Sequence, residues 1–301
     1  MDFSKSISIA TGTSTSAYLN LNSITSAPTV GTLFSGYVIE SVSYANGPIV
    51  GFTDPLAQRD GLDTDIALLP TRQTQMIVQV YGSSSNDFYD KIDAMNAAFQ
   101  PYPDFAISAD GFRNLDFNQP TGITEYTANG IPMRLSVRPL AIPSYNLNND
   151  MVTPRTSDRG LTTRASISMV SKDPRKICQT AKTGSIALTS GSATTSLTNN
   201  GNYYAYPTFT IVSNLTTAST LTISTSLWTT ALSISTGAKT TVLNSLARTV
   251  TSNGSLLMSS ITSTTTKLPY LASGANSVTL AFSGGGAFPS SISYSYQEAW
   301  I

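Results

Sequence analysis

From about residue 177 to the end of the chain, apolar residues alternate with serine and threonine at a period of two. Phe209 and Ile211 alternate with Thr208, Thr210 and Val212, and Leu280 stands between Thr279 and Ala281. Successive side chains of a strand point to opposite faces, so this pattern predicts antiparallel strands with one buried face and one hydroxyl-bearing face. Turn signals such as Asn253-Gly254 separate the runs and predict a β-sandwich. The alternation and the aromatic residues argue against a flexible Ser/Thr linker.

Charge divides the chain at about the same place. Residues 1–176 hold 13 basic and 16 acidic residues, a net charge of −3. Residues 177–301 hold four basic residues and one acidic residue, a net charge of +3. Such a change in composition is typical of a domain boundary, and we predict two domains, 1–178 and 179–301.

The first segment mixes strand and helix patterns. Alternating apolar residues near Met76 and Met133 predict strands, and the apolar spacing over 86–99 predicts one helix, capped by Ser85 or Asn86. The stretch 51–71 has no clean period and predicts a long loop. We therefore predict a mainly β chain: an N-terminal α+β domain, rich in sheet with one helix, followed by a β-sandwich.

The residues needed for common chemistry are scarce. The chain has no histidine and a single cysteine, Cys178, which excludes Ser-His and Cys-His dyads, histidine metal sites and an internal disulfide. Asp60, Asp63 and Asp65 lack the spacing of a calcium loop. We therefore predict no catalytic residues, no metal site and no cofactor.

Two groups of side chains are weak candidates for binding. Tyr203, Tyr204 and Tyr206 form an aromatic cluster that is either a sugar platform or a packed edge of the sandwich. Arg134 and Arg138 share one face of a predicted strand, as any solvated pair would. With a formal net charge of zero, the chain as a whole gives no electrostatic reason to bind nucleic acid.

Targeting signals are not evident. The start of the chain, MDFSKSISIATG, is a poor signal peptide, and no run approaches 18 consecutive apolar residues. We expect that the protein does not insert into a membrane and that it is made in the cytoplasm.

Four motifs, in order along the chain, resemble those of siphophage distal tail proteins. They are SISMVSKDPRKI (166–177), NNGNYYAYPTFTIVS (199–213), VLNSLARTVTSNG (242–254) and LASGANSVTLAF (271–282). The family has a strand ending in Asp-Pro-Arg before its second domain, and then Asn-Gly, an apolar residue with Pro and alternating apolar residues. The helix over 86–99, followed by a proline, also has a counterpart there.

The resemblance covers about residues 36–282, with two departures. The family usually has aspartate where Asn244 stands, and often proline where Ser273 stands. The positions that match the family, and for which the resemblance implies a structural role, are Asp173, Pro174, Asn200, Gly201, Pro207, Arg248, Gly274 and Asn276.

The resemblance implies a structural protein of the virion, at the tip of a phage tail. It implies a ring, most often a hexamer, formed by the N-terminal domain and leaving a conduit for DNA. It implies a galectin-like C-terminal sandwich and, as partners, the tail tube, the tail-tip or lysin protein and receptor-binding proteins. Two other classes stay open: a carbohydrate-binding module or tail-tip adhesin, and a carboxylate glycosidase.

Overall fold

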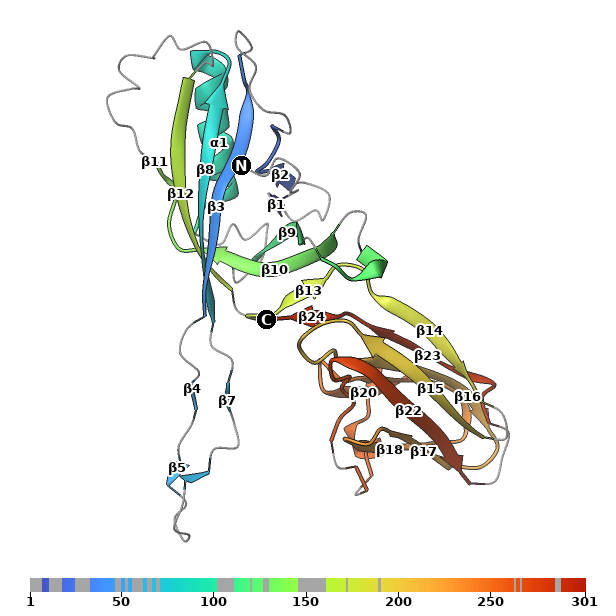
Figure 1. The fold of residues 1–301 in the computed structure, drawn as a ribbon. Helices are drawn as coiled ribbons and strands as arrows, with labels where there is room; N and C mark the ends of the chain where they lie inside the picture. The colour runs from blue at the N-terminus through green and yellow to red at the C-terminus, as the bar shows by residue number, and fades with distance from the viewer. Residues whose placement is uncertain are drawn as a thin grey trace. The chain divides into compact units, whose positions relative to one another are not determined.

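A computed structural model describes most of the chain (Figure 1). The described residues are 7–10, 18–24, 33–46, 50–51, 54–55, 62–63, 67–68, 71–101, 111–119, 121–126, 130–145, 161–171, 173–188, 191–262, 264–265, 267–284 and 288–301. They form two compact units, Met1–Pro174 and Arg175–Ile301. The sequence predicted the boundary after residue 178, four residues beyond the end of unit 1. The predicted position is the end of β13 (Lys176–Cys178), a strand that pairs with β24 (Ala299–Trp300) near the end of the chain.

Unit 1 is built on one antiparallel sheet with the strand order β2-β1-β9-β10-β12-β8-β3. The strands are β1 (Ile7–Ala10), β2 (Tyr18–Asn20), β3 (Gly36–Asn46), β8 (Arg72–Gly82), β9 (Arg113–Gln119), β10 (Ile131–Pro139) and β12 (Leu161–Ser171), with β11 (Ser144–Tyr145) beside β12. Met76 and Met133, which carried the sequence prediction, are buried on β8 and β10. The alternation therefore assigned both strands and their inward face correctly.

The connection between β3 and β8 differs from the predicted loop. Four short strands lie in it: β4 (Val50–Gly51), β5 (Asp54–Pro55), β6 (Leu62–Asp63) and β7 (Ala67–Leu68). β4 pairs with β7 and β5 pairs with β6, so the β3–β8 hairpin continues as backbone pairing. Pairing of backbone groups needs no apolar periodicity, which is why the sequence did not reveal it.

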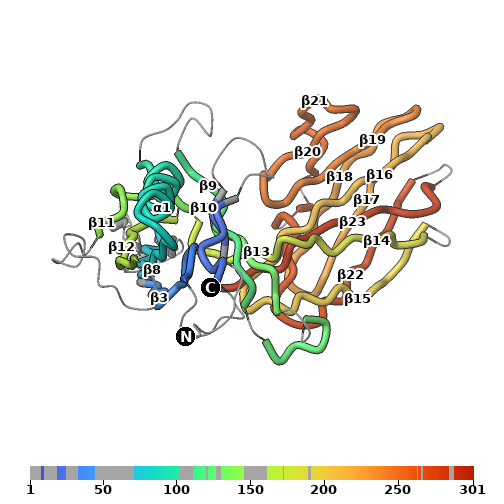
Figure 2. Tube along the Cα trace, turned by 90° about the horizontal axis from the view of Figure 1, so that it is seen from above, coloured from blue at the N-terminus to red at the C-terminus, as the bar shows by residue number. Residues whose placement is uncertain are grey.

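The one α-helix of the described residues, α1 (Ser85–Ala98), packs mainly on β8 (Figures 1 and 2). Phe88, Met95 and Phe99 are buried as the spacing predicted. The predicted cap at Ser85 or Asn86 is wrong. The cap is Ser84, whose hydroxyl accepts the bond from the Asp87 N–H at 3.2 Å. At the other end, the buried Arg113 guanidinium donates to the carbonyls of Ala98 and Gln100 and satisfies the end of the helix.

Asp87 anchors the start of α1. Its carboxylate accepts bonds from the Ser83 N–H at 2.8 Å and from two hydroxyls, and Lys91 lies 3.3 Å away. The Ser83 bond is the main reason that the pKa of Asp87 falls to about 2. The carboxylate therefore stabilises the folded state above the ordinary pKa of 3.8, and this contribution is lost as the pH falls from roughly 5 toward 2.

We expect Asp87→Asn to lower stability by about 1 kcal/mol at pH 7, since this largely exposed carboxylate is screened by solvent. Thermal denaturation followed by circular dichroism should show a gap to the wild type at pH 7 that closes at pH 2. Asp90→Asn, on the exposed side of the same helix, is the control. An equal gap at both pH values would contradict the assignment.

Unit 2 consists of two antiparallel sheets that share one core, as predicted for a sandwich. The first has the order β14-β23-β16-β19-β20-β21: β14 (Lys182–Ala187), β23 (Ser291–Tyr296), β16 (Thr208–Leu215), β19 (Gly237–Asn244), β20 (Thr249–Ser252) and β21 (Ser255–Leu256). The second has the order β15-β22-β17-β18: β15 (Ser192–Asn199), β22 (Gly274–Ser283), β17 (Ser219–Ser224) and β18 (Thr229–Ile234). One short 3-10 turn occurs in this unit at Met258–Ser260, and another occurs in unit 1 at Thr124–Tyr126.

The predicted alternation is confirmed in the core of unit 2. Phe209, Ile211 and Leu280 are fully buried, and their Ser and Thr neighbours face outward or are half-buried. The Asn253-Gly254 turn is confirmed as well. It joins β20 to β21 with φ of 48° at Asn253 and 81° at Gly254, as a tight hairpin turn requires.

Candidate functional surfaces

A mostly polar face with one charged residue, Arg164, covers the outward side of strands β3, β8 and β12 in unit 1. The strand register places these side chains on one side of the sheet, and we call them the Gln/Ser face: Ser41, Ser43, Gln73, Gln75, Ile77, Gln79, Thr162, Arg164, Ser166 and Ser168. All are exposed or half-buried, whereas Met76, Val78 and Val80 point to the opposite side and are buried. Most of these side chains are exposed, whereas Gln79 and Ser168 are half-buried.

The charged group on this face is paired. Arg164 contacts the carboxylate of Glu40 at 2.9 Å, next to the bulge in β3. On β9 and β10, Arg134 forms a two-point ion pair with Asp116, with bonds of 2.7 and 2.8 Å. Arg138, the other arginine singled out from the sequence, lies over the ring of Phe112 at 5.4 Å. A carboxylate therefore neutralises Arg134 and Arg164, whereas Arg138 packs on an aromatic ring and keeps its positive charge.

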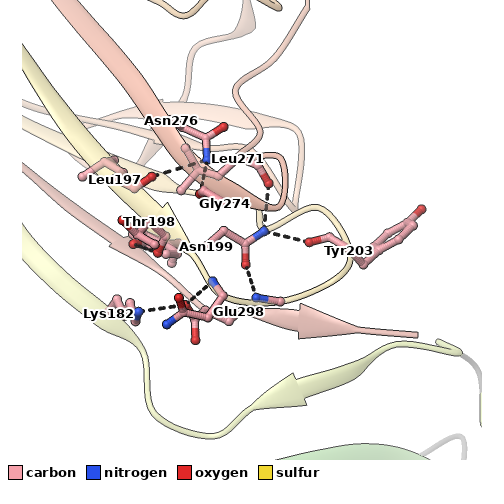
Figure 3. Close-up of polar contacts among 12 residues, drawn as sticks. Lys182, Leu197, Thr198, Asn199, Tyr203, Leu271, Gly274, Asn276 and Glu298 are labelled. Atoms are coloured by element: carbon pink, nitrogen blue, oxygen red, sulfur yellow. Dashed lines mark hydrogen bonds and ion pairs between the residues drawn. The ribbon is translucent and has the colours of Figure 1, made fainter. Parts of the chain in front are cut away.

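In unit 2, the Asn-Gly motif forms a turn held by the side chain of the preceding residue. The Asn199 amide donates to the carbonyls of Tyr203 and Leu271, at 2.8 and 3.1 Å, and its oxygen accepts the Gly201 N–H (Figure 3). Gly201 is not among the described glycines with positive φ. It is needed for space, because a Cβ there would lie 2.1 Å from the carbonyl oxygen of Ala299.

The backbone of the same turn is hydrogen-bonded to a buried carboxylate. Glu298 is fully buried, forms an ion pair with Lys182 at 2.8 Å and accepts the Asn200 N–H at 2.7 Å (Figure 3). It is the only acidic residue after Asp173. Sequence reasoning missed its role, although a lone acid among Ser and Thr residues was a usable signal.

Asn276, in the motif 271–282, lies close to the same turn. Its oxygen accepts the Ala272 N–H, and its amide donates to the carbonyls of Ala272, Gly274 and Leu197, at 2.9, 2.9 and 3.4 Å. The strand pairing of Asn199 with Gly274 brings the bonds of Asn276 next to those of the Asn200-Gly201 turn. We call the network formed by these residues with Lys182, Asn199 and Glu298 the turn cluster.

The other matching positions lie apart from the turn cluster. Pro207 is buried and its carbonyl accepts the Ser245 N–H, while Arg248 is exposed with φ of 55° in the turn before β20. Asp173 and Pro174 end unit 1, and the Asp173 carbonyl accepts a bond from the Ser171 hydroxyl. The structural role that the resemblance implies for these four positions stays a prediction.

The tyrosine cluster lines a cleft. Tyr204 packs against Tyr203 and Tyr270, with ring centroids 5.2 and 5.0 Å apart, and is still 45% exposed. Tyr206 lies under the guanidinium of Arg175 at 5.3 Å. The cleft, which we call the aromatic cleft, is partly open to solvent, has room for about 40 Å³ and is lined by Arg175, Ile177, Tyr204, Tyr206, Leu246, Gln297 and Ala299.

Other predicted features give no further site. Asp60 and Asp65 lie outside the described residues, and Asp63 belongs to β6. Among the described residues, no group of three acidic or cysteine side chains could hold a metal ion. No helix in this part of the chain is long and apolar enough to cross a membrane.

Comparison with known proteins identifies the fold. No family model and no curated protein matches the sequence. The crystal structure of the SPP1 Dit protein, described as a paradigm of the hub adsorption apparatus in phages infecting Gram-positive bacteria, matches over 88% of this chain and 94% of its own. The TM-score is 0.53 and the identity 14%. The phage P2 baseplate in its activated conformation with Ca matches 98% of both chains at 8% identity and a TM-score of 0.38.

The chain thus has the fold of the SPP1 Dit protein across both units. The mainly β fold class is confirmed, and the resemblance to distal tail proteins, found in the motifs, is confirmed at the level of the fold.

Proposed function

We propose that this chain is a structural phage protein of the distal tail type, which forms a ring at the tip of the tail. The observation that carries the proposal is the fold of SPP1 Dit over 88% of the chain. The family-like motifs support it, because four of their positions meet in the turn cluster. The proposed location is the virion, at the end of the tail.

Ring formation is assigned to unit 1. β3 has 11 residues and stands at one edge of the sheet formed by the described strands, with β2 at the other. A long exposed edge pairs readily with another chain, and natural proteins cover or blunt such edges. Head-to-tail contacts between copies close into a ring when the rotation fits. A hexamer is the expected size from the family resemblance.

The Gln/Ser face supports a conduit for DNA through that ring. Tight binding to a duplex requires lysine and arginine side chains that neutralise phosphates. The face carries amides and hydroxyls, and its arginine is paired with Glu40. A ring whose lumen is lined by this face would let DNA pass without holding it.

Unit 2 is proposed as the projecting, galectin-like module. A tight protein interface usually has an apolar and aromatic centre, whereas the outward faces of the strands in unit 2 carry mostly Ser and Thr. We expect the tail tube and the tail-tip or lysin protein to contact the ring, and receptor-binding proteins to attach to unit 2. No catalytic role is proposed.

Light scattering with negative-stain imaging of the full chain tests the proposal. We expect a single ring species of six copies at micromolar protein concentration. A strict monomer at high concentration, with no rings after tail-tube protein is added, would contradict it. Mixed with duplex DNA, the rings should show no micromolar, salt-sensitive binding, and such binding would overturn the conduit.

A further inference from the structure

The four-stranded sheet of unit 2 ends in β18 on one side and in β15 on the other (Figure 2). An edge strand carries a row of backbone N–H and C=O groups that its one neighbour does not use. Such a row is a template for pairing with another chain, unless the protein covers or blunts it. The cover on each edge therefore decides what that edge can bind.

The β18 edge is covered by the segment that follows the 3-10 turn at Met258–Ser260. The Ala231 carbonyl accepts the Thr262 N–H at 2.9 Å, and the Ala231 N–H donates to the Thr265 hydroxyl at 2.9 Å. Next to it, the Thr229 carbonyl accepts the Lys267 N–H at 3.5 Å. The backbone groups that β18 points away from its sheet are thus bonded within unit 2.

The β15 edge has no such cover in the part of the chain that the structure describes. The Gly191 carbonyl accepts the Phe282 N–H at 2.8 Å, and the register with β22 then runs along the whole of β15 without a shift. Because the bonds of an antiparallel pair alternate, residues 193, 195 and 197 bond to β22. The backbone groups of Ser192, Thr194 and Ser196 point to the open side, and no described residue bonds to them.

β15 also lacks the features that usually block an edge. Its sequence, SATTSLTN, contains no charged residue and no proline, and its pairing with β22 contains no bulge. The Thr198 carbonyl points away from β22 as well, since it accepts the Tyr296 hydroxyl from the other sheet at 2.8 Å. β15 is therefore a regular and neutral edge, open over most of its length.

The two faces of β15 indicate which side chains an added strand would carry. Its outer face holds exposed hydroxyls without charge, on Ser192, Thr194, Ser196 and Thr198. On the core face, Ala193 packs against the core of unit 2 but is only half-buried. Apolar side chains on one face of an added strand would extend the core, and small polar side chains would continue the hydroxyl face.

We propose that the β15 edge binds an extended segment of a partner protein, which adds a strand to this sheet. The segment pairs with the backbone at 192, 194 and 196 and carries alternating apolar and small uncharged side chains. Main-chain bonds supply the affinity of such strand addition, and alternate side chains supply its specificity. A second β15 fits less well, because only Ala193 and Leu197 on its core face are apolar. The inference does not depend on ring formation, because every residue in it belongs to unit 2.

Hydrogen exchange of the full chain, resolved to single amides by mass spectrometry, tests the edge directly. In the free protein, the amides at 192, 194 and 196 should exchange much faster than those at 193, 195 and 197. The probe is a short peptide of alternating threonine and valine with a lysine at each end. At saturation it should slow the three open amides at least ten-fold and leave the amides of β18 unchanged.

Variants of one residue separate the backbone donor from the side chain. Fluorescence anisotropy of the labelled peptide should give a Kd on the order of 0.1 mM for the wild type. Thr194→Pro removes an N–H that β22 does not use, so the fold should persist while binding weakens at least ten-fold. Thr194→Val keeps the N–H and should bind within three-fold of the wild type.

Two controls accompany these variants. Ser185→Pro makes the same change at an outward-pointing N–H of β14, an edge of the other sheet, and should leave peptide binding unchanged. The same peptide with a proline at its centre should not bind. Circular dichroism checks that each variant is folded.

Four outcomes would overturn the proposal. The first is no binding of the peptide at 20-fold above the expected Kd, and the second is binding that survives Thr194→Pro in a folded protein. The third is protection that appears on β14 in place of β15. The fourth is a Thr194→Pro protein with fewer copies in its particle, which would make a second copy the occupant. Ring formation itself is measured separately, so either proposal can fail while the other stands.

Discussion

Replacing Glu298 with alanine should destabilise unit 2 by about 3 kcal/mol, because it leaves Lys182 and the Asn200 N–H without their shared buried partner. Lys182 is only 22% exposed, so water cannot fully replace the carboxylate. Both tryptophans, Trp228 and Trp300, belong to unit 2, so their fluorescence during urea denaturation of the full chain reports on this unit alone. The midpoint should fall clearly below that of the wild type.

A double variant separates the lost ion pair from the lost volume. Lys182→Met combined with Glu298→Met removes both charges and keeps most of the apolar bulk, so it should recover much of the stability. Glu125→Ala, at an exposed acid in unit 1, should leave the tryptophan transition unchanged. An unchanged midpoint in Glu298→Ala would show that the turn cluster does not hold the sandwich together.

Gly201→Ala should cost about 3 kcal/mol in the same assay, as expected when a packed site is overfilled and a bond is lost. The added Cβ would meet the Ala299 carbonyl oxygen at 2.1 Å, and this is backbone that cannot rotate away. The Tyr203 N–H donates to the same oxygen at 3.1 Å, so the shift would break that bond too. Gly122→Ala, with no atom within 4 Å of the new Cβ, lies in unit 1 and is the control in thermal denaturation followed by circular dichroism, where it should change stability by less than about 0.5 kcal/mol. Equal stability of the two variants would refute the close approach.

The sequence predicted the features that depend on local periodicity. Alternation placed Phe209 and Leu280 in the core of unit 2, and three- and four-residue spacing placed Phe88 and Met95 on the buried face of α1. Both patterns arise because one face of each element is buried, so they are visible in the sequence without knowing the partner. The fold class followed from them.

The features that depend on distant partners were not predictable from the sequence. The Asn-Gly pair at 200–201 matches a family motif, but Gly201 is needed because Ala299 approaches from the far end of the chain. Glu298 and Lys182 are 116 positions apart, and no spacing rule joins them. The cleft under Tyr204 and Tyr206 likewise requires Leu246 and Gln297 from other strands and turns.

The central claim is that the chain forms a ring through its first unit. Light scattering on fragments 1–174 and 175–301 tests it most directly, since this division keeps β13 together with its partner β24. We predict that 1–174 assembles into the same ring as the full chain. We predict that 175–301 is a folded β-protein and a monomer. Rings from 175–301, or a monomeric 1–174 that stays folded at high concentration, would contradict the claim.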